Sequence, residues 1–394
     1  MTIAKPIWLP EFQSNWDLIP LKRLCTIETG TADTQDADPD GSYDFVIRSP
    51  RLKQASTYTF DCEAIVTAGD GAVGEVFHYM NGPFLAHQRT YVLHSFQGID
   101  ARYLFYFFSS HFRFMCQDGS AKTTVDSVRR WMLTDMPILV PPENLQKRIA
   151  QFLDTETAKI DHLIAKQREL ITLTESRLKL WRERTFWGEV QTEDPFLNPP
   201  TGWKVLRNRH LLEHVDARSE TGDEEMLSVS HITGVTPRSM KNVNMFEAES
   251  TVGYKLVAEN ELVINTMWAW MGALGVSAYE GIVSPAYNVY RFRDLDAVNP
   301  MYFDCMYRTD AYVSLMKAHS RGIWESRLRL YPEVFLRLSS LVPPKDVQDR
   351  LVAENNERTT EAEKLITRCH KAIELLQERR SALITAAVTG QIEV

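Results

Sequence analysis

The sequence predicts an α+β fold in which two mixed α/β globular domains alternate with two long helices. Three observations lead to this prediction. The chain repeats itself, each repeat contains a long amphipathic stretch without Pro or Gly, and short apolar runs stand beside aromatic-rich segments in each half. At ~150 residues per domain, 394 residues suit two to three domains, and the apolar fraction of 44% is that of a globular protein.

The repeat appears when two blocks of sequence are compared. Val140-Pro141-Pro142 recurs as Val342-Pro343-Pro344, at an offset of 202 residues. The same offset relates Gln146 to Gln348 and Gly188 to Gly390, with no gap between them. A fixed offset kept over such a length indicates one structural unit used twice.

Each repeat ends in a predicted helix. Two stretches lack Pro and Gly and carry apolar residues at steps of three, four and seven: Gln146 to about Trp187 and Gln348 to about Val388. Each stretch follows Pro-Pro and ends before a glycine. About 40 residues give a rod of roughly 60 Å. We expect the two helices to pair with each other as an antiparallel coiled coil, and pairing with other chains is the alternative.

The globular parts combine predicted strands with helices. Short apolar runs typical of strands occur at Ala64–Thr67, Glu261–Asn265, Tyr91–Leu93 and Val289–Phe292. Aromatic-rich helices are predicted at Tyr103–Phe108 and Met301–Met306. We interpret these aromatic stripes as core rather than base-stacking surfaces. The predicted boundaries are 1–145 and 195–345 for the globular domains, and 146–194 and 346–394 for the helical spacers.

The charge balance restricts the function. The formal charge is −8; residues 1–142 carry 12 basic and 16 acidic residues, and residues 194–344 carry 15 and 18. Because DNA-binding domains are usually basic, nucleic-acid contact would have to come from local patches, and the chain alone should hold DNA weakly. Five scattered cysteines without a CxxC pair, no run of 18 apolar residues and no signal-peptide core favour a cytoplasmic location without membrane attachment.

Three short motifs suggest catalytic or metal chemistry, and each has a simpler interpretation. Gly69-Asp-Gly-Ala-Val-Gly74 fits GxGxxG, but a strand-like run follows it, so we expect a tight strand–turn–strand. Asn198-Pro-Pro-Thr201 lacks the aromatic residue that adenine methyltransferases stack on a flipped base. His210 and His214 would share one helical face, yet no third zinc ligand is evident. We expect no catalytic centre, metal or cofactor on this chain.

Basic residues gather at the end of each globular part. Hydroxyl, basic and aromatic side chains together are what a loop that contacts phosphates and bases uses. The candidates for DNA contact are Lys122, Thr123, Arg129 and Arg130 in the first half and Arg321, Trp324, Arg327 and Arg329 in the second. A solvated charged loop is the alternative interpretation.

The chain resembles the specificity subunit of type I restriction-modification systems. The entry to the first helix, with Pro141-Pro142, Gln146 and Ile149, is similar to that family's P-P-x-x-x-Q-x-x-I pattern, and the ending Arg380–Val394 is similar to its LI…AVTG-x-I ending. The order of globular and helical parts also agrees. The first copy departs at Thr185-Phe-Trp-Gly188, where the family pattern has Ala-Val-Thr-Gly.

The resemblance implies a non-catalytic subunit that reads double-stranded DNA. Each globular part would be a target-recognition domain reading one half of a split, asymmetric site, and the coiled coil, with its pseudo-two-fold repeat, would separate the two domains. Two modification subunits would supply S-adenosylmethionine-dependent methylation, and restriction subunits would supply ATP- and Mg-dependent translocation and cleavage.

Three more residues are candidates for base reading. His87, Gln88 and Asn288 are predicted to lie in matched segments between strands, with ordinary loop polarity as the alternative. Two rival functions remain open at this point: a self-contained bifunctional DNA methyltransferase and a coiled-coil scaffold without a DNA role.

Overall fold

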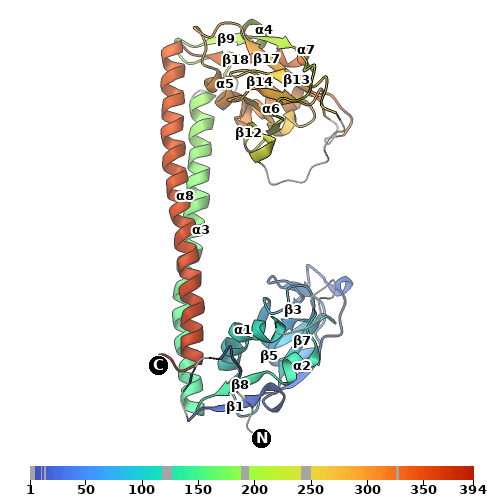
Figure 1. Cartoon of the computed structure of the whole chain (residues 1–394), viewed down its shortest axis with the longest axis vertical. Coiled ribbons are helices and arrows are strands. Elements are labelled where there is room, and N and C mark those ends of the chain that lie inside the picture. Colours follow the sequence, from blue (N-terminus) through green and yellow to red (C-terminus); the bar gives the residue numbers. More distant parts are fainter. Residues whose placement is uncertain are drawn as a thin grey trace. The chain divides into compact units, whose positions relative to one another are not determined.

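The computed structural model of the chain describes residues 5–9, 11–12, 15–117, 127–187, 195–240, 250–324 and 328–394. It forms two compact units, which we describe one at a time (Figure 1). Unit 1 comprises residues 1–168 and 370–394, and unit 2 comprises residues 169–369. The units divide both long helices, so the domain boundaries expected from the sequence stay predictions.

Unit 1 is built on a six-stranded sheet in the order β2-β7-β5-β6-β3-β4. A separate pair, β1 with β8, is antiparallel, and α1 packs on the sheet. The elements are β1 (Asp17–Pro20), η1 (Leu21–Arg23), β2 (Thr26–Thr29), η2 (Thr34–Asp36), β3 (Tyr43–Val46), β4 (Lys53–Ala55), β5 (Phe60–Ala68), β6 (Phe77–Ala86), β7 (Thr90–His94), α1 (Ala101–Gln117), α2 (Arg130–Thr134), β8 (Pro137–Val140) and the first part of α3 (Glu143–Phe186).

Unit 2 repeats this plan in shorter strands. Its largest sheet has the order β10-β17-β14-β15, and two-stranded pairs complete it. The elements are β9 (Lys204–Arg207), α4 (Asn208–Leu211), β10 (Leu212–Val215), β11 (Leu227–Ser230), β12 (Gly234–Pro237), η3 (Arg238–Met240), β13 (Lys255–Val257), β14 (Leu262–Asn265), η4 (Ala269–Met271), β15 (Leu274–Val276), β16 (Gly281–Val283), β17 (Tyr287–Phe292), α5 (Pro300–Tyr307), α6 (Asp310–His319), α7 (Pro332–Phe335), β18 (Ser339–Val342) and the first part of α8 (Lys345–Val388).

The hydrogen-bonded registers show which strands correspond. β10-β17-β14-β15 matches β2-β7-β5-β6, β9 with β18 matches β1 with β8, and the β11–β12 hairpin matches β3–β4. β5 and β6 pair continuously over eight residue pairs, from Phe60↔Phe84 to Thr67↔Phe77. In unit 2 the same ladder is split into β13–β16 and β14–β15. The predicted α+β repeat is therefore confirmed, with one ladder interrupted in the second copy.

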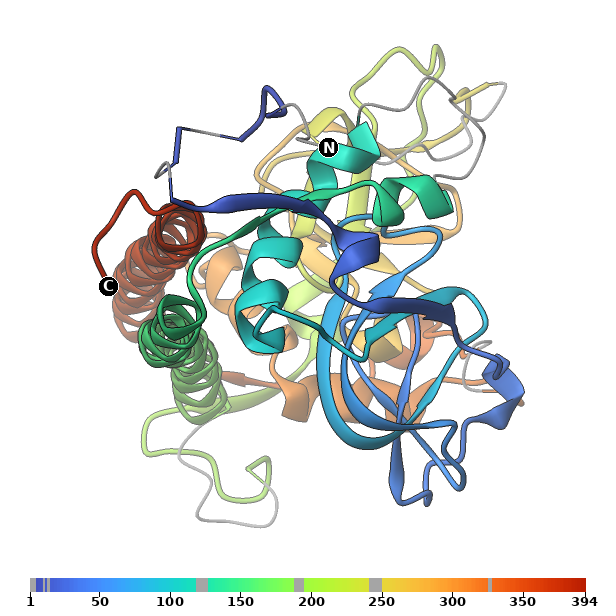
Figure 2. The same ribbon diagram turned by 90° about the horizontal axis from the view of Figure 1, so that it is seen from below.

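The two long helices pair antiparallel inside each unit. Each begins at the residue after Pro-Pro, which is three residues earlier than predicted, and each is 44 residues long. In unit 1, Arg380 donates to the Asp161 carboxylate at 2.9 and 3.1 Å. In unit 2, Arg182 donates to Asn355 Oδ1 at 2.8 Å and to Thr359 Oγ1 at 2.7 Å. Figure 2 shows the helices side by side, which confirms intramolecular pairing.

The helix contact is narrower than the predicted apolar stripe. Ile160 and Ile164 are buried, but Leu163 is 49% and Leu170 is 38% exposed. On α8 the buried positions include Asn355, Ala362 and Cys369 at seven-residue spacing, so small and polar residues occupy much of the seam. Exposed leucines thus remain available on α3.

In each unit one glutamine side chain joins the globular domain to the long helix by hydrogen bonds. Gln146 is 1% exposed; its side chain accepts from Asp100 N at 2.6 Å and donates to Pro141 O at 2.8 Å. Gln348 is 0% exposed; it accepts from Asn299 N at 2.7 Å and donates to Pro343 O at 2.9 Å. The amide satisfies backbone groups on both sides of the junction, which explains why glutamine recurs at the repeat offset.

The aromatic stripes are core, as predicted. Tyr103, Phe107 and Phe108 on α1 and Tyr302 and Phe303 on α5 are completely buried. Each such side chain adds about 1.5–3 kcal/mol to folding by its burial. α1 and α5 lie within the main hydrophobic clusters of unit 1 and unit 2, respectively.

The rejected motifs have ordinary structural roles. Gly69–Gly74 forms the turn between β5 and β6, with Gly71 and Gly74 at φ +77° and +75°, so the strand–turn–strand prediction is confirmed. The shared helical face of His210 and His214 is wrong, because His210 lies in α4 and His214 in β10. Among described residues no group of three metal-ligating side chains occurs, and none of the described helices is long and apolar enough to span a membrane.

Candidate nucleic-acid interface

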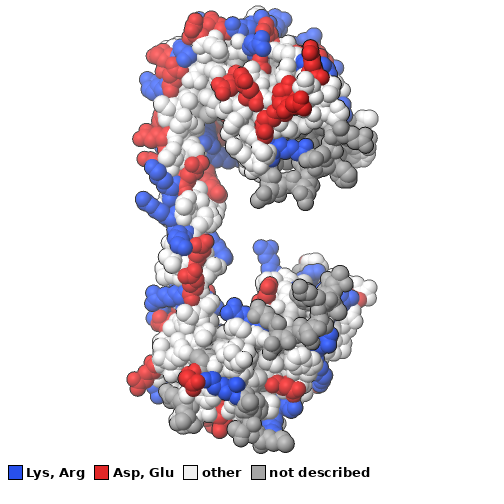
Figure 3. Space-filling view, in the orientation of Figure 1, with Lys and Arg blue, Asp and Glu red and all other residues white. Residues whose placement is uncertain are grey.

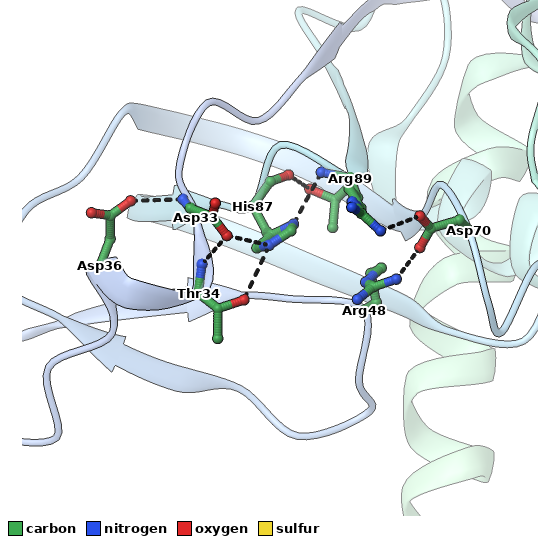
Figure 4. A network of polar contacts seen from close by, with 8 residues as sticks. Asp33, Thr34, Asp36, Arg48, Asp70, His87 and Arg89 are labelled. Carbon is green, nitrogen blue, oxygen red and sulfur yellow. Dashed lines mark hydrogen bonds and ion pairs between the residues drawn. The ribbon is translucent and has the colours of Figure 1, made fainter.

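In unit 1, polar residues that follow the ends of four strands meet at one place (Figure 4). We call this the strand-end edge. β2 is followed by Asp33 and Thr34, β3 by Arg48, β5 by Asp70, and β6 by His87 and Arg89. Residues that directly follow strands lie on loops carried by a rigid sheet, which is where binding residues concentrate.

Backbone hydrogen bonds hold this edge together. Gly69 N donates to Arg89 O at 2.8 Å, and Val128 N donates to Gly69 O at 2.8 Å. Asp70 also pairs with Ser127 as a β-bridge. The described part of the basic segment, from Ser127 onward, is therefore hydrogen-bonded to the end of β5.

Asp70 joins two arginines at the edge. One carboxylate oxygen accepts from Arg48, and the other accepts from Arg89 Nη1 at 3.2 Å. The Asp70 side chain is 18% exposed, whereas Arg48 and Arg89 are 41% and 58% exposed. The three groups carry a net charge of +1, and both guanidinium groups are open to solvent.

His87 is placed to position its neighbours. The residue is 4% exposed and its Nδ1 accepts from Arg89 N at 3.0 Å. Its Nε2 faces Thr34 Oγ1 at 3.4 Å and Asp33 Oδ1 at 3.6 Å. Burial, helped by the charge of Arg48, lowers the pKa of His87, which favours the neutral ring. Any contribution of His87 to recognition would therefore pass through the loops that it holds.

A hollow opens beside these residues. Its volume is about 370 Å³, and it is lined by Thr34, Ile47, Arg48, Ser49, Asp70, Gly71, Ala72 and His87. The lining mixes hydroxyl groups, a backbone turn and charged groups, so it can accept a polar edge of a ligand.

The predicted residues of unit 1 lie on or beside this edge where they are described. Gln88 is exposed next to Arg89, and Arg129 is exposed one residue after Val128. Arg130 donates through Nη2 to Ile27 O of β2 at 3.1 Å, so its guanidinium is anchored to the sheet. Lys122 and Thr123 lie outside the described residues.

The corresponding edge of unit 2 carries an isolated antiparallel β-bridge between Arg321 and Arg329. Arg321 and Arg329 exchange backbone hydrogen bonds of 3.0 and 2.9 Å, and Leu330 N donates to Thr266 O, after β14, at 3.2 Å. This places the predicted basic segment at the strand end equivalent to Gly69. Both arginines are exposed, as is Trp324 at 68%. Arg327 lies outside the described residues.

Aromatic side chains replace the charged cluster in unit 2. Trp268 and Trp270 follow β14 and stack at 6.3 Å with an interplanar angle of 15°. Trp268 is 49% exposed, and Ile323 beside Trp324 is 94% exposed. Large exposed apolar side chains grouped on one edge indicate a contact surface.

The predicted location of Asn288 needs correction. It lies inside strand β17, where it pairs with Ile264, rather than between strands. The equivalent pair in unit 1 is Tyr91 with Thr67, so Asn288 matches Tyr91 and not His87 or Gln88. Asn288 is 7% exposed, and its Oδ1 accepts from Lys255 Nζ at 3.5 Å. These matched strands are related by an offset of 197 residues, from Thr67 to Ile264 and from Tyr91 to Asn288, rather than the 202 residues that relate the helix entries.

Sequence reasoning missed Arg48, Asp70, Arg89, Trp268 and Lys255. Arg48 and Asp70 each come within two residues of the end of an apolar run, so strand-end position was a usable signal for them. The sequence holds no such signal for Lys255. It is 5% exposed and forms an ion pair with Asp216 at 3.4 Å, and only the fold brings these two residues together.

The surface charge agrees with the composition. Over the face drawn in Figure 3, acidic and basic side chains are interspersed on each unit where residues are described. On this face the described basic side chains thus form no single broad patch.

The sequence of this chain is similar to a known protein family and to a known relative. The family described as "Type I restriction modification DNA specificity domain" matches residues 13–173. The type I restriction enzyme EcoDI specificity subunit of Escherichia coli is 28% identical over 156 residues, which is 40% of this chain and 34% of that relative. The match thus spans about a third of the relative's length.

Solved structures extend the likeness over nearly the whole chain. One, from a study of complex assembly and conformational transition of the type I R-M system, has a TM-score of 0.72 and covers 97% of this chain and 100% of that one. The HsdS subunit from Thermoanaerobacter tengcongensis has a TM-score of 0.53 and covers 97% and 99%. Both are 13% identical, so they show a shared fold, which confirms the predicted architecture of mixed domains and paired helices.

Proposed function

We propose that this chain is a specificity subunit of a type I restriction-modification system and that it reads a bipartite, asymmetric DNA site with one unit per half-site. As a specificity subunit it is not itself an enzyme. Methyl transfer and cleavage would take place on modification and restriction subunits, which would hold S-adenosylmethionine, ATP and Mg. We expect this assembly in the cytoplasm, where the DNA is.

The observation that carries the proposal is the repeated strand-end edge. In both units a basic segment is hydrogen-bonded to the residue after the central strand, Gly69 in unit 1 and Thr266 in unit 2. Two edges with the same backbone frame suit two DNA segments of the same shape. Because their side chains differ, they would read different sequences, and the site would not be palindromic.

The DNA contacts within each edge divide into two kinds. Exposed Arg129, Arg321 and Arg329 suit phosphates, which position a protein on the duplex. Gln88, Trp324 and the arginines beside Asp70 suit base edges, which specify sequence. Lys122, Thr123 and Arg327 remain predicted contacts, and we assign His87 and Asn288 to holding the loops and strands behind the edge.

Partner docking is supported by the long helix. α3 carries exposed leucines that the antiparallel partner helix leaves uncovered: Leu163, Leu170, Leu173 and Leu180. Exposed apolar side chains at helical spacing suit contact with another protein chain. We propose that two modification subunits per complex dock in part on this surface. These subunits would also supply the non-specific attraction to DNA that a chain of formal charge −8 lacks.

The test is to map methylated bases in a host that expresses this chain with its modification subunits. The expected motif has two short defined parts separated by undefined bases, and the two parts differ. A continuous or palindromic motif would contradict the bipartite reading. Methylation that needs no modification subunit would favour a self-contained methyltransferase, and failure to capture any modification subunit would favour a scaffold.

A further inference from the structure

The Asp70 cluster is built from three separate strand ends. Arg48 follows β3, Asp70 follows β5, and Arg89 lies in the turn between β6 and β7. Each carboxylate oxygen of Asp70 takes one arginine, so the two guanidinium groups converge on one anion (Figure 4). An arginine has five N–H donors, so each side chain keeps donors beyond those that Asp70 accepts.

The backbone behind the cluster is held on both sides. Arg89 accepts through its carbonyl from Gly69 N at 2.8 Å, and its own N–H donates to His87 Nδ1 at 3.0 Å. Gly69 in turn accepts from Val128 N at 2.8 Å. The arginines are thus presented by a rigid frame and oriented by a common carboxylate, which lowers the entropy lost when they bind.

Stability does not explain this arrangement. Two like charges converge, and their side chains are 41% and 58% exposed. Ion pairs at such exposure add little to folding. Arg48 and Asp70 of the cluster line the hollow of about 370 Å³, together with Thr34 and Ser49, where a ligand edge can reach them.

We propose that Arg48 and Arg89, oriented by Asp70, form an arginine fork that reads a G·C pair in the major groove. The inference rests on the proposed DNA-reading function of the chain and assigns part of the half-site of unit 1. Guanine offers the acceptors O6 and N7 to an arginine, and the paired cytosine offers its N4 amino group to a carboxylate. The arginine–carboxylate array carries the complementary donors and acceptor. Asp70 positions both arginines and also supplies the acceptor for the cytosine amino group.

A phosphate is the poorer fit. A carboxylate between the two arginines repels a phosphate, and its hold on both guanidinium groups keeps them from following the backbone. The clearest distinction is geometric: bidentate base reading needs the planar fork of arginine, whereas a phosphate contact tolerates lysine as a point charge.

The experiment uses the assembled methyltransferase and its mapped site. Binding is measured for duplexes in which each base pair of the two half-sites is changed in turn. For Arg89→Ala we expect affinity for the native site to fall roughly 5- to 150-fold, the fold-change of ~1–3 kcal/mol per bidentate contact, and discrimination at one G·C pair to be lost. Arg89→Lys should lose the same discrimination. Asp70→Asn should weaken discrimination at that pair without altering the other half-site.

Lys22→Ala is the matched control. It breaks the exposed Lys22–Asp135 ion pair of the same unit, which lies outside the edge, and should change neither affinity nor specificity. Arg89→Lys keeps charge and length, so it remains informative if an alanine variant fails to assemble. Two results would contradict the fork. Arg89→Ala could lower affinity equally for all sequences and give a shallower salt slope, or Arg89→Lys could keep full affinity and discrimination; either would make Arg89 a phosphate contact. If the wild-type complex has no bipartite site, the proposed function fails instead.

Discussion

The strand-end edges of the two units have the same backbone frame and different chemistry. In unit 1 the residues after the central strand are Gly69 and Asp70, and two arginines converge on the carboxylate. In unit 2 the same strand end is followed by Thr266 and then by stacked Trp268 and Trp270. The comparison teaches that the repeat preserves how a loop is anchored while it leaves the side chains on that loop free to differ.

The interiors differ in a similar way. Leu21 and Asn208 occupy equivalent positions: Leu21 N donates to Met136 O at 2.9 Å, and Asn208 N donates to Leu338 O at 2.8 Å. Leu21 is part of an apolar core. Asn208 instead bonds to Tyr312, Phe335, Tyr307 and Ser340. At this position unit 1 thus has apolar packing, whereas unit 2 has a buried polar network.

Exchanging these two residues should have the largest effect. Leu21→Asn buries an amide in an apolar core, and Asn208→Leu leaves tyrosine and serine hydroxyls without their partner, so each should destabilise its own unit by about 3 kcal/mol. Hydrogen exchange resolved by unit measures this loss. Leu21→Met, which conserves volume, is the control. Loss of protection in the unmutated unit would show that the two units do not unfold separately.

The next largest effect should be a difference between the two units in how acid changes their stability. Burial lowers the pKa of His111 in unit 1 to about 4, below its ordinary value of 6.5. Between these values the unfolded chain binds a proton that the folded unit does not, so unit 1 should lose up to about 1.4 kcal/mol per pH unit as the pH falls from about 6.5 to about 4. In unit 2, burial raises the pKa of Glu183 and Asp304, which favours the folded state at lower pH.

The measurement is hydrogen exchange at pH 7 and pH 5, with His111→Phe as the test variant. The ring of His111 stacks on Phe107 at 4.6 Å, so phenylalanine keeps the aromatic packing. It should reduce the acid sensitivity of unit 1 without abolishing it, because burial also lowers the pKa of His78 and His87, whereas His162→Gln at an exposed position of α3 should leave it unchanged. Equal acid sensitivity of both units would contradict this account.

The helix seam should respond more weakly. Arg182→Ala removes hydrogen bonds to Asn355 and Thr359 and should destabilise unit 2 by about 1–2 kcal/mol. Arg380→Ala removes an exposed pair with Asp161 and should cost unit 1 at most about 1 kcal/mol. Urea unfolding followed by unit-resolved exchange compares them, and an effect of Arg380→Ala as large as that of Arg182→Ala would contradict the difference in burial.

The smallest effect concerns Arg329 in the β-bridge of unit 2. If Arg329 contacts a phosphate, Arg329→Ala in the assembled methyltransferase should weaken binding to all duplexes alike, and the slope of log K against log salt should fall in magnitude by about 0.9. Titrations at several salt concentrations measure this. Loss confined to one base pair would instead place Arg329 on a base edge.

The long helices and the repeat could be predicted from the sequence because both have local signals. Pro-Pro, a stretch without Gly or Pro and a terminal glycine delimit α3 and α8, and Gln146 and Gln348 recur because each satisfies the same backbone groups. The basic segments around Arg129 and Arg329 were found because charge density is visible in sequence.

The rest of the site depends on residues that only the sheet brings together. Arg48, Asp70 and Arg89 are far apart along the chain and meet because β3, β5 and β6 are neighbours. Asn288 was misplaced because the offset that relates the matched strands, 197 residues from Tyr91 to Asn288, differs from the 202 residues that relate the helix entries. No periodicity reports such a shift.

The central claim is that each unit reads its own half-site, and it is tested most directly by comparing methylated motifs of two variants in the assembled methyltransferase. Arg89→Ala alters the edge of unit 1, and Trp324→Ala alters the edge of unit 2. We expect each variant to relax bases in one half of the motif and leave the other half unchanged, with different halves affected. Relaxation in the same half, or in both halves for either variant, would contradict the claim.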